Sequence, residues 1–260
     1  MFRLIFRWSG RCGLGMLLVA SLLSAWQWST SAVHTIESVA LQETRTYRVF
    51  NPHSEAQIVY SLDGATLRNS LVPAAVFSIA AILQGRDPPK IVAVYSNANR
   101  DRDFRPVISA PTYWRPRIVG RSSEFDTFLM RELMPQIEGR QANEMRRYLL
   151  GHSLSGLYAL DLASRAPGHF AGVFAFAPTF SHDTTIGGRL PTACNANTIL
   201  YANWGLESSR DTKVFTATEG RWKADSRCRK HPPLTPRHYG SLHQIVMLTG
   251  QIHAAFLLFD

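Results

Sequence analysis

The sequence predicts an α/β fold: a single domain in which a mostly parallel sheet is flanked by helices. Short β-rich runs alternate with amphipathic helical segments, which is typical of parallel sheets covered on both faces. The 260 residues, 45% of them hydrophobic, suffice for one core rather than two. No repeat, low-complexity tract or linker divides the chain.

The N-terminus has the pattern of a secretory signal. Three arginines, at positions 3, 7 and 11, precede the apolar run 14–25, and the small residues Ser29-Thr30-Ser31-Ala32 come after it. We therefore expect residues 1–32 to be a signal peptide, with Ala25 as a competing cleavage site, and residues 33–260 to be the folded domain. The run is too short for a comfortable membrane span, and an uncleaved anchor is the alternative. The prediction is a bacterial protein that is periplasmic or secreted, with membrane contact only if the signal is uncleaved.

Charge and cysteine content argue against nucleic-acid binding and metal binding. The formal charge of +9 falls to +6 without the three leader arginines, and no basic run with interleaved aromatic residues indicates nucleic-acid binding. Cys12 leaves with the signal, so Cys194 and Cys228 form the expected disulfide. Two free thiols are the alternative. Neither cysteine has a CxxC neighbour, so we expect no metal and no cofactor.

The expected elements follow from periodicity and from turn residues. The expected strands are residues 47–51, 57–62, 91–96, 147–151, 172–177, 199–203 and 243–248. The expected helices are residues 66–83, 123–137, 154–163 and 212–223.

The segment Gly151-His152-Ser153-Leu154-Ser155-Gly156 joins an expected strand to an expected helix. In the nucleophile elbow G-x-S-x-G, small residues allow a sharp turn that exposes the serine hydroxyl above the sheet. Ser155 stands where that pattern has glycine, and serine is small enough for the turn. An ordinary turn with Ser153 as a helix N-cap is the alternative interpretation. The elbow indicates an α/β-hydrolase fold with Ser153 as nucleophile.

A serine nucleophile needs a histidine base and usually an acid, which follow it in the order acid then histidine in the α/β-hydrolase fold. His253 comes after the expected last strand and the turn Thr249-Gly250, so it is the expected base. Glu207 follows the strand 199–203 and is the preferred acid, with Asp211 as the alternative. We interpret five further residues as solvated or satisfied polar groups: His182, Asp183, His231, His238 and His243. The Leu154 amide and that of Gly64 or Ala65, after the strand 57–62, are the expected oxyanion donors.

Several segments together resemble the putative-esterase, or esterase-D-like, family of α/β-hydrolases, including its periplasmic enterochelin and salmochelin trilactone esterases. They are VYSLDG (59–64), NANRDRDFRP (97–106), FDTFLMRELMPQIE (125–138), GHSLSGL (151–157) and LTGQIH (248–253). The resemblance implies that Ser153 is the nucleophile and His253 the base. Thr179 lies in a segment where relatives tend to carry Ser-Pro-Ser and tryptophans, so the pocket is expected to differ.

The expected function is an exported serine hydrolase that cleaves a carboxylic ester through an acyl-enzyme. An anionic ferric siderophore suits a basic protein, and Arg100 and Arg102, with Arg105, are its expected contacts. A simple acyl ester fits the motif equally well. The alternatives are an acyltransferase with the same Ser-His machinery and a non-catalytic binding module on a hydrolase scaffold.

Overall fold

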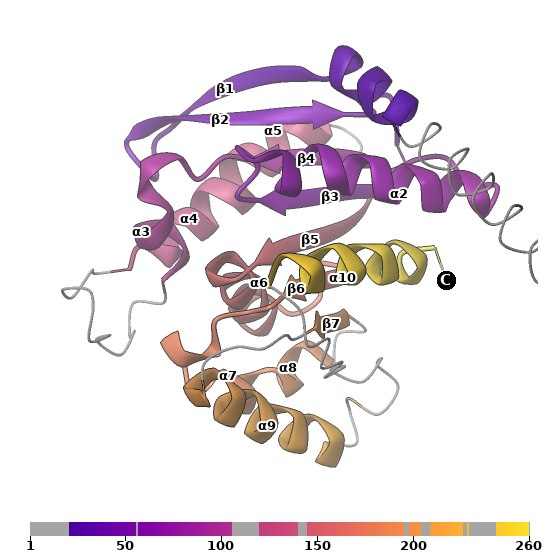
Figure 1. Ribbon diagram of the computed structural model, residues 1–260. Coiled ribbons are helices and arrows are strands. Elements are labelled where there is room, and N and C mark those ends of the chain that lie inside the picture. The colour runs from indigo at the N-terminus through magenta and orange to yellow at the C-terminus, as the bar shows by residue number, and fades with distance from the viewer. Residues whose placement is uncertain are drawn as a thin grey trace, which may run out of the picture.

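The fold is built on a seven-stranded sheet with strand order β1-β2-β4-β3-β5-β6-β7 (Figure 1). This computed structural model describes residues 21–55, 57–105, 120–139, 145–194, 198–203, 209–225, 228 and 243–259. The strands are β1 (Ala32–Ser38), β2 (Glu43–Phe50), β3 (Gln57–Leu62), β4 (Lys90–Val94), β5 (Arg146–His152), β6 (Gly172–Phe176) and β7 (Ile199–Asn203). The strands β4, β3, β5, β6 and β7 are parallel, whereas β1 and β2 pair antiparallel at one edge.

Helices cover both faces of the sheet. On one face, α2 (Leu71–Leu83) and α10 (His243–Leu257) pack side by side over a core that includes Phe77, Phe174 and Ala254 (Figure 1). The second core lies on the other face and includes Phe125, Leu157 and Phe215. Its helices are α4 (Ser122–Thr127), the π-helical turn Phe128–Leu133, α5 (Met134–Glu138), α6 (Leu154–Arg165), α7 (Ile186–Arg189), α8 (Pro191–Cys194) and α9 (Ser209–Ala224). The short α3 (Arg100–Phe104) follows β4.

The predicted fold class is confirmed, and the strands expected at 57–62 and 199–203 have these bounds in the structure. Residues 32–38, where no strand was expected, form the edge strand β1. One expectation is wrong. Residues 243–248, expected to be the last strand, are the first part of helix α10. The short apolar run 245–248 fits a strand or a buried helix equally well, and here the helix continues to residue 257.

The predicted disulfide between Cys194 and Cys228 is present, with Cα atoms 5.2 Å apart. It fastens the end of α8 to the segment that follows α9. Residues 21–30, within the predicted signal, form a helix. No helix of the described ranges is long and apolar enough to cross a bilayer.

Candidate active site

Ser153 occupies a sharp turn between β5 and α6, as the elbow motif predicts. Its backbone has φ 60° and ψ −119°, in the left-handed region that non-glycine residues rarely adopt. Gly151 makes the turn possible, because a Cβ there would lie 2.1 Å from the Ser155 carbonyl oxygen. The Ser153 side chain makes no capping hydrogen bond to α6. Ser153 therefore holds the N-cap position of α6, but its hydroxyl does not cap the helix.

The Ser153 hydroxyl instead meets Thr179, in the turn after β6. The two hydroxyl oxygens are 3.2 Å apart, and the Thr179 amide donates to the Ser153 carbonyl oxygen at 3.2 Å. Ala177, which begins this turn, also has a positive φ of 44°. In the sequence, Thr179 stands out only as a departure from the family pattern. Its contact with Ser153 depends on β6 lying next to β5, which no local pattern shows.

Ser155, the departure from the elbow pattern, is tied into a buried polar cluster. Its hydroxyl accepts from the His152 amide at 3.0 Å and donates to an Asp63 carboxylate oxygen at 2.8 Å. The Asp63 carboxylate, at the turn after β3, also accepts from the Ser96 hydroxyl at 2.8 Å and from Arg100 Nε at 2.9 Å. Asp63 thus joins three loops at the carboxyl edge of the sheet: those after β3 and β4, and the elbow.

The two arginines expected to bind substrate are engaged with protein groups. Arg100 pairs with Asp63 and donates to the His152 carbonyl oxygen at 3.2 Å. It therefore stabilises the backbone of the elbow next to Ser153. Arg102 pairs with Glu43 at 2.9 Å and with Asp103 at 3.2 Å. Arg105 is buried.

Asp103 also binds the fully buried Arg45. Burial raises the pKa of the Asp103 carboxyl above its usual value, against the pull of the Arg45 and Arg102 guanidinium groups. This part of the basic loop therefore has a structural role in these contacts.

One of the expected oxyanion donors is already used. The Gly64 amide donates to the Val94 carbonyl oxygen at 2.8 Å, so it is not available to a substrate. Gly64 is needed for packing, because a Cβ there would lie 2.5 Å from the backbone of Ala93. Ala65, the next residue, remains the candidate on this side. The Leu154 amide is in the first turn of α6, where amides have no partner within the helix.

The expected base, His253, does not follow a strand. It lies in the middle of α10, and its ring makes an edge-to-face contact with Tyr201, with ring centroids 5.2 Å apart. Tyr201 pairs with Phe174 in β6, and Phe174 pairs with Leu150 in β5. Leu150 precedes Ser153 by three residues, which is about 10 Å along the strand. His253 therefore lies beside the sheet about 10 Å from Ser153, toward the amino ends of the strands.

The direction of α10 brings its other end to the catalytic edge. Near the carboxyl ends of the strands, Met247 and Gln251 surround one small void together with Gly151 and His152. At the opposite end of the sheet, the Tyr148 hydroxyl donates to the Leu258 carbonyl oxygen at 3.4 Å. The helix therefore runs from the carboxyl edge of the sheet toward its amino edge.

The first residue of α10 is His243. It begins the helix about 15 Å along the axis from His253, in the direction of the elbow. In the sequence, His243 has the pattern of a strand residue, and the helix that carries it is not evident there.

The two candidates for the acid are Glu207 and Asp211. Glu207 lies outside the described residues, and Asp211 lies in the first turn of α9. Within the described ranges, no three His, Cys, Asp or Glu side chains are grouped as metal ligands would be.

The fold and the elbow define an α/β-hydrolase with a serine at the nucleophile position. The family model of the Putative esterase family matches residues 38–238, so the chain belongs to this family of carboxylic ester hydrolases. No curated protein sequence gives a significant match.

Solved structures with the same fold agree with this family. An IroE-like serine hydrolase from Shewanella oneidensis has a TM-score of 0.69 at 20% identity, covering 88% of this chain and 80% of its own. The BES protein from Bacillus cereus has a TM-score of 0.68 at 23% identity, covering 87% and 94%. The siderophore hydrolase EstA from Aspergillus nidulans has a TM-score of 0.67 at 18% identity, with the same coverage as the BES protein.

Proposed function

We propose that this esterase hydrolyses its substrate through an acyl-enzyme on Ser153. The backbone of Ser153 carries the proposal, because a strained left-handed serine that does not cap its helix is the geometry of an exposed nucleophile. The Ser153 oxygen attacks the ester carbonyl, the alcohol leaves, and water then attacks the acyl-enzyme. The amides of Leu154 and Ala65 stabilise the oxyanion of each tetrahedral intermediate.

His243, rather than His253, is the proposed general base. A base must come within hydrogen-bond reach of the serine hydroxyl, directly or after substrate binds. His243 begins α10 at the end of the helix nearer the elbow, whereas His253 lies against Tyr201, back along the sheet. Either Glu207 or Asp211 orients the imidazole in this proposal, since both follow β7 in the chain order of the fold.

The two histidines form a matched pair for testing the base. His243→Ala is expected to lower kcat by about 100-fold or more, which is the contribution of a general base. His253→Ala, in the same helix, is expected to change kcat by less than about threefold, because the ring packs on Tyr201 away from the reaction. Thermal unfolding of both variants verifies that α10 is intact. The opposite order of effects would return the role of base to His253.

The proposed substrate class is a siderophore ester such as a catecholate trilactone. Structures of siderophore hydrolases and of the enterobactin esterase from Shigella flexneri share the fold, and the chain has a net positive charge that suits an anionic ligand. The proposed location is the periplasm or the cell exterior. The leader pattern and the disulfide support export, because disulfides persist in oxidising compartments.

A panel of substrates tests both the proposed substrate class and the role of Ser153. The wild-type protein is assayed with p-nitrophenyl esters of increasing chain length and with a catecholate trilactone, and Ser153→Ala serves as the control. We expect higher kcat/KM for the trilactone, and a loss of at least about 1,000-fold in Ser153→Ala with every substrate. A strong preference for short acyl chains would refute the siderophore substrate. Full activity in Ser153→Ala would refute the mechanism.

A further inference from the structure

The helix formed by residues 21–30 is docked on the catalytic domain rather than standing apart from it. Gln27 is buried, and its side-chain amide donates to the Ser78 hydroxyl at 2.6 Å and to the Ala74 carbonyl oxygen at 3.1 Å, both in α2. Arg48 of β2 lies 4.0 Å over the Trp28 ring and donates to the Ser31 hydroxyl at 2.7 Å. These contacts hold the helix 21–30 against α2 and β2.

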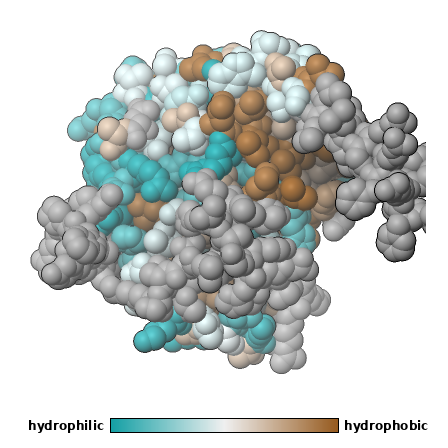
Figure 2. Space-filling model, in the orientation of Figure 1, coloured by the Kyte–Doolittle hydropathy of each residue, from teal (hydrophilic) through white to brown (hydrophobic). Residues whose placement is uncertain are grey.

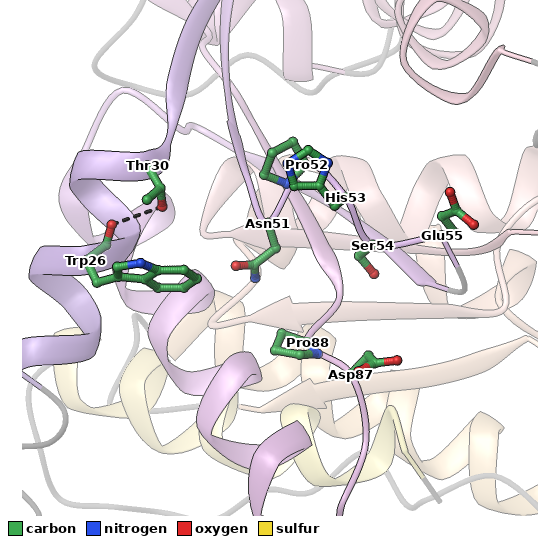
Figure 3. A pocket seen from close by; sticks show the side chains of 9 residues that line it. All are labelled: Trp26, Thr30, Asn51, Pro52, His53, Ser54, Glu55, Asp87 and Pro88. Atoms are coloured by element: carbon green, nitrogen blue, oxygen red, sulfur yellow. Dashed lines mark hydrogen bonds between the residues drawn. The ribbon is translucent and has the colours of Figure 1, made fainter.

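A cavity of about 660 Å³ has this helix as one wall (Figure 3). Trp26 and Thr30 of the helix face Asn51 and Pro88 across it. The cavity lies near the amino ends of β3 and β4, at the edge of the sheet opposite Ser153. Cleavage after Ala32 would remove this wall, and it would cut the chain at the first residue of β1, which is paired with Val49.

The apolar surface of the domain is concentrated on this helix and its neighbours. Among the described residues, the exposed large apolar side chains on three helices are Leu22, Trp26 and Trp28 of residues 21–30, Ile82 and Leu83 of α2, and Leu248, Ile252 and Phe256 of α10. The α10 residues recur every fourth position, so they form one outward stripe. Figure 2 shows this surface as a brown patch over α2 and α10.

The absence of charged residues distinguishes this surface from one on which single apolar side chains are exposed among polar ones. Neither α2 nor α10 contains an Asp, Glu, Lys or Arg residue, although helices at a water-exposed surface usually carry charges on their outer faces. Isolated exposed apolar residues need no explanation, but a contiguous patch on adjacent helices indicates an interaction site. Tryptophans such as Trp26 and Trp28, at the end of an apolar run, are typical of the membrane interface.

We propose that helix 21–30, α2 and α10 form a membrane-docking face, and that the N-terminal segment is retained and inserts in the same bilayer. The occupant is a lipid bilayer because, in the sequence, the apolar run 14–25 overlaps the start of helix 21–30, and Gln27 of this helix is bonded to α2. Leu248 lies in the first half of α10, so the proposed face extends toward the carboxyl edge of the sheet, which carries Ser153. The proposal does not depend on Ser153 being catalytic.

The test uses the full-length chain with Cys12→Ser, so that one introduced cysteine carries an environment-sensitive fluorophore. Phe256→Cys places the probe on the proposed face. Val39→Cys, on the turn between β1 and β2 and 85% exposed, is the matched control. The protein is reconstituted in vesicles of equal parts phosphatidylethanolamine and phosphatidylglycerol, with and without brominated acyl chains. We expect brominated lipid to quench the probe at position 256 at least about threefold more than at position 39.

Three results would overturn the proposal. Equal quenching at the two positions would show that the face is not in lipid. Protection of position 256 that rises with protein concentration in the absence of vesicles would show that a second copy covers the face. A mature protein from cells that starts after Ala25 or Ala32, as determined by mass spectrometry, would show that the N-terminal segment is removed. Ester hydrolysis by the detergent-solubilised protein separates these results from any failure of catalysis.

Discussion

Asp63 is the residue on which the geometry of the elbow most depends. Its carboxylate accepts hydrogen bonds from Ser96, Arg100 and Ser155, which belong to two different loops. The sequence shows Asp63 only as part of a turn. Its partners are separated from it by 33, 37 and 92 residues, so no local pattern predicts them. For the same reason, the sequence assigns Arg100 to substrate, whereas the structure shows it paired.

Replacing Asp63 by Asn tests this role. The amide keeps the size of the side chain but leaves Arg100 without a carboxylate, so we expect the free energy of unfolding to fall by about 2 kcal/mol. We also expect kcat to fall more than KM changes, because the elbow loses its support. Asp63 is a positioning residue in this account, since it does not contact the nucleophile.

Ser155→Ala is the matched control for Asp63→Asn. It removes one hydroxyl from the same cluster and leaves the charge pair, so the expected loss of stability is about 1 kcal/mol. Denaturant unfolding and steady-state kinetics are the measurements. Wild-type kcat in a folded Asp63→Asn protein would contradict the positioning role.

At the scale of elements, α10 is where prediction from sequence failed. The pair Thr249-Gly250 has the composition of a turn. The segment before it was therefore predicted to be a strand, although the structure has one continuous helix. Gly250 instead lies inside the helix, where a Cβ would be 2.3 Å from Asn203 Nδ2 and 2.6 Å from Phe176 Cδ1. The glycine allows a close approach of helix and sheet, and this requirement cannot be read from the residues around it. For the same reason His253 was expected after a strand, whereas it lies in the middle of α10.

Gly250→Ala tests whether this close packing positions α10. We expect a loss of about 1 to 3 kcal/mol of stability from overpacking, and a lower kcat because the start of the helix is displaced. Gly220→Ala in the exposed part of α9 is the control, because a Cβ at that position would have no described atom within 4 Å. That substitution is expected to stabilise the protein by about 0.5 to 1 kcal/mol. Thermal unfolding and ester hydrolysis distinguish the two, and equal effects would contradict the account.

At the scale of the whole molecule, most of the architecture could be predicted from the sequence. Alternation of β-rich and helical segments identified the parallel sheet, because its central strands such as β4 are buried on both faces. The edge strand β1 was missed, since its first five residues are largely exposed and lack a buried face. The disulfide was predicted because only two cysteines follow the leader. In the chain-entropy model it stabilises the fold by about 3 to 4 kcal/mol.

Labelling by a fluorophosphonate, followed by mass spectrometry of the modified peptide, is the most direct test of whether Ser153 is the nucleophile. The account predicts stoichiometric phosphonylation of Ser153 in the wild-type protein and none in Ser153→Ala. His243→Ala should be labelled at least about 100-fold more slowly than the wild type. Unlabelled Ser153 in well-folded protein, or a label on another residue that persists in Ser153→Ala, would contradict a serine nucleophile at the elbow.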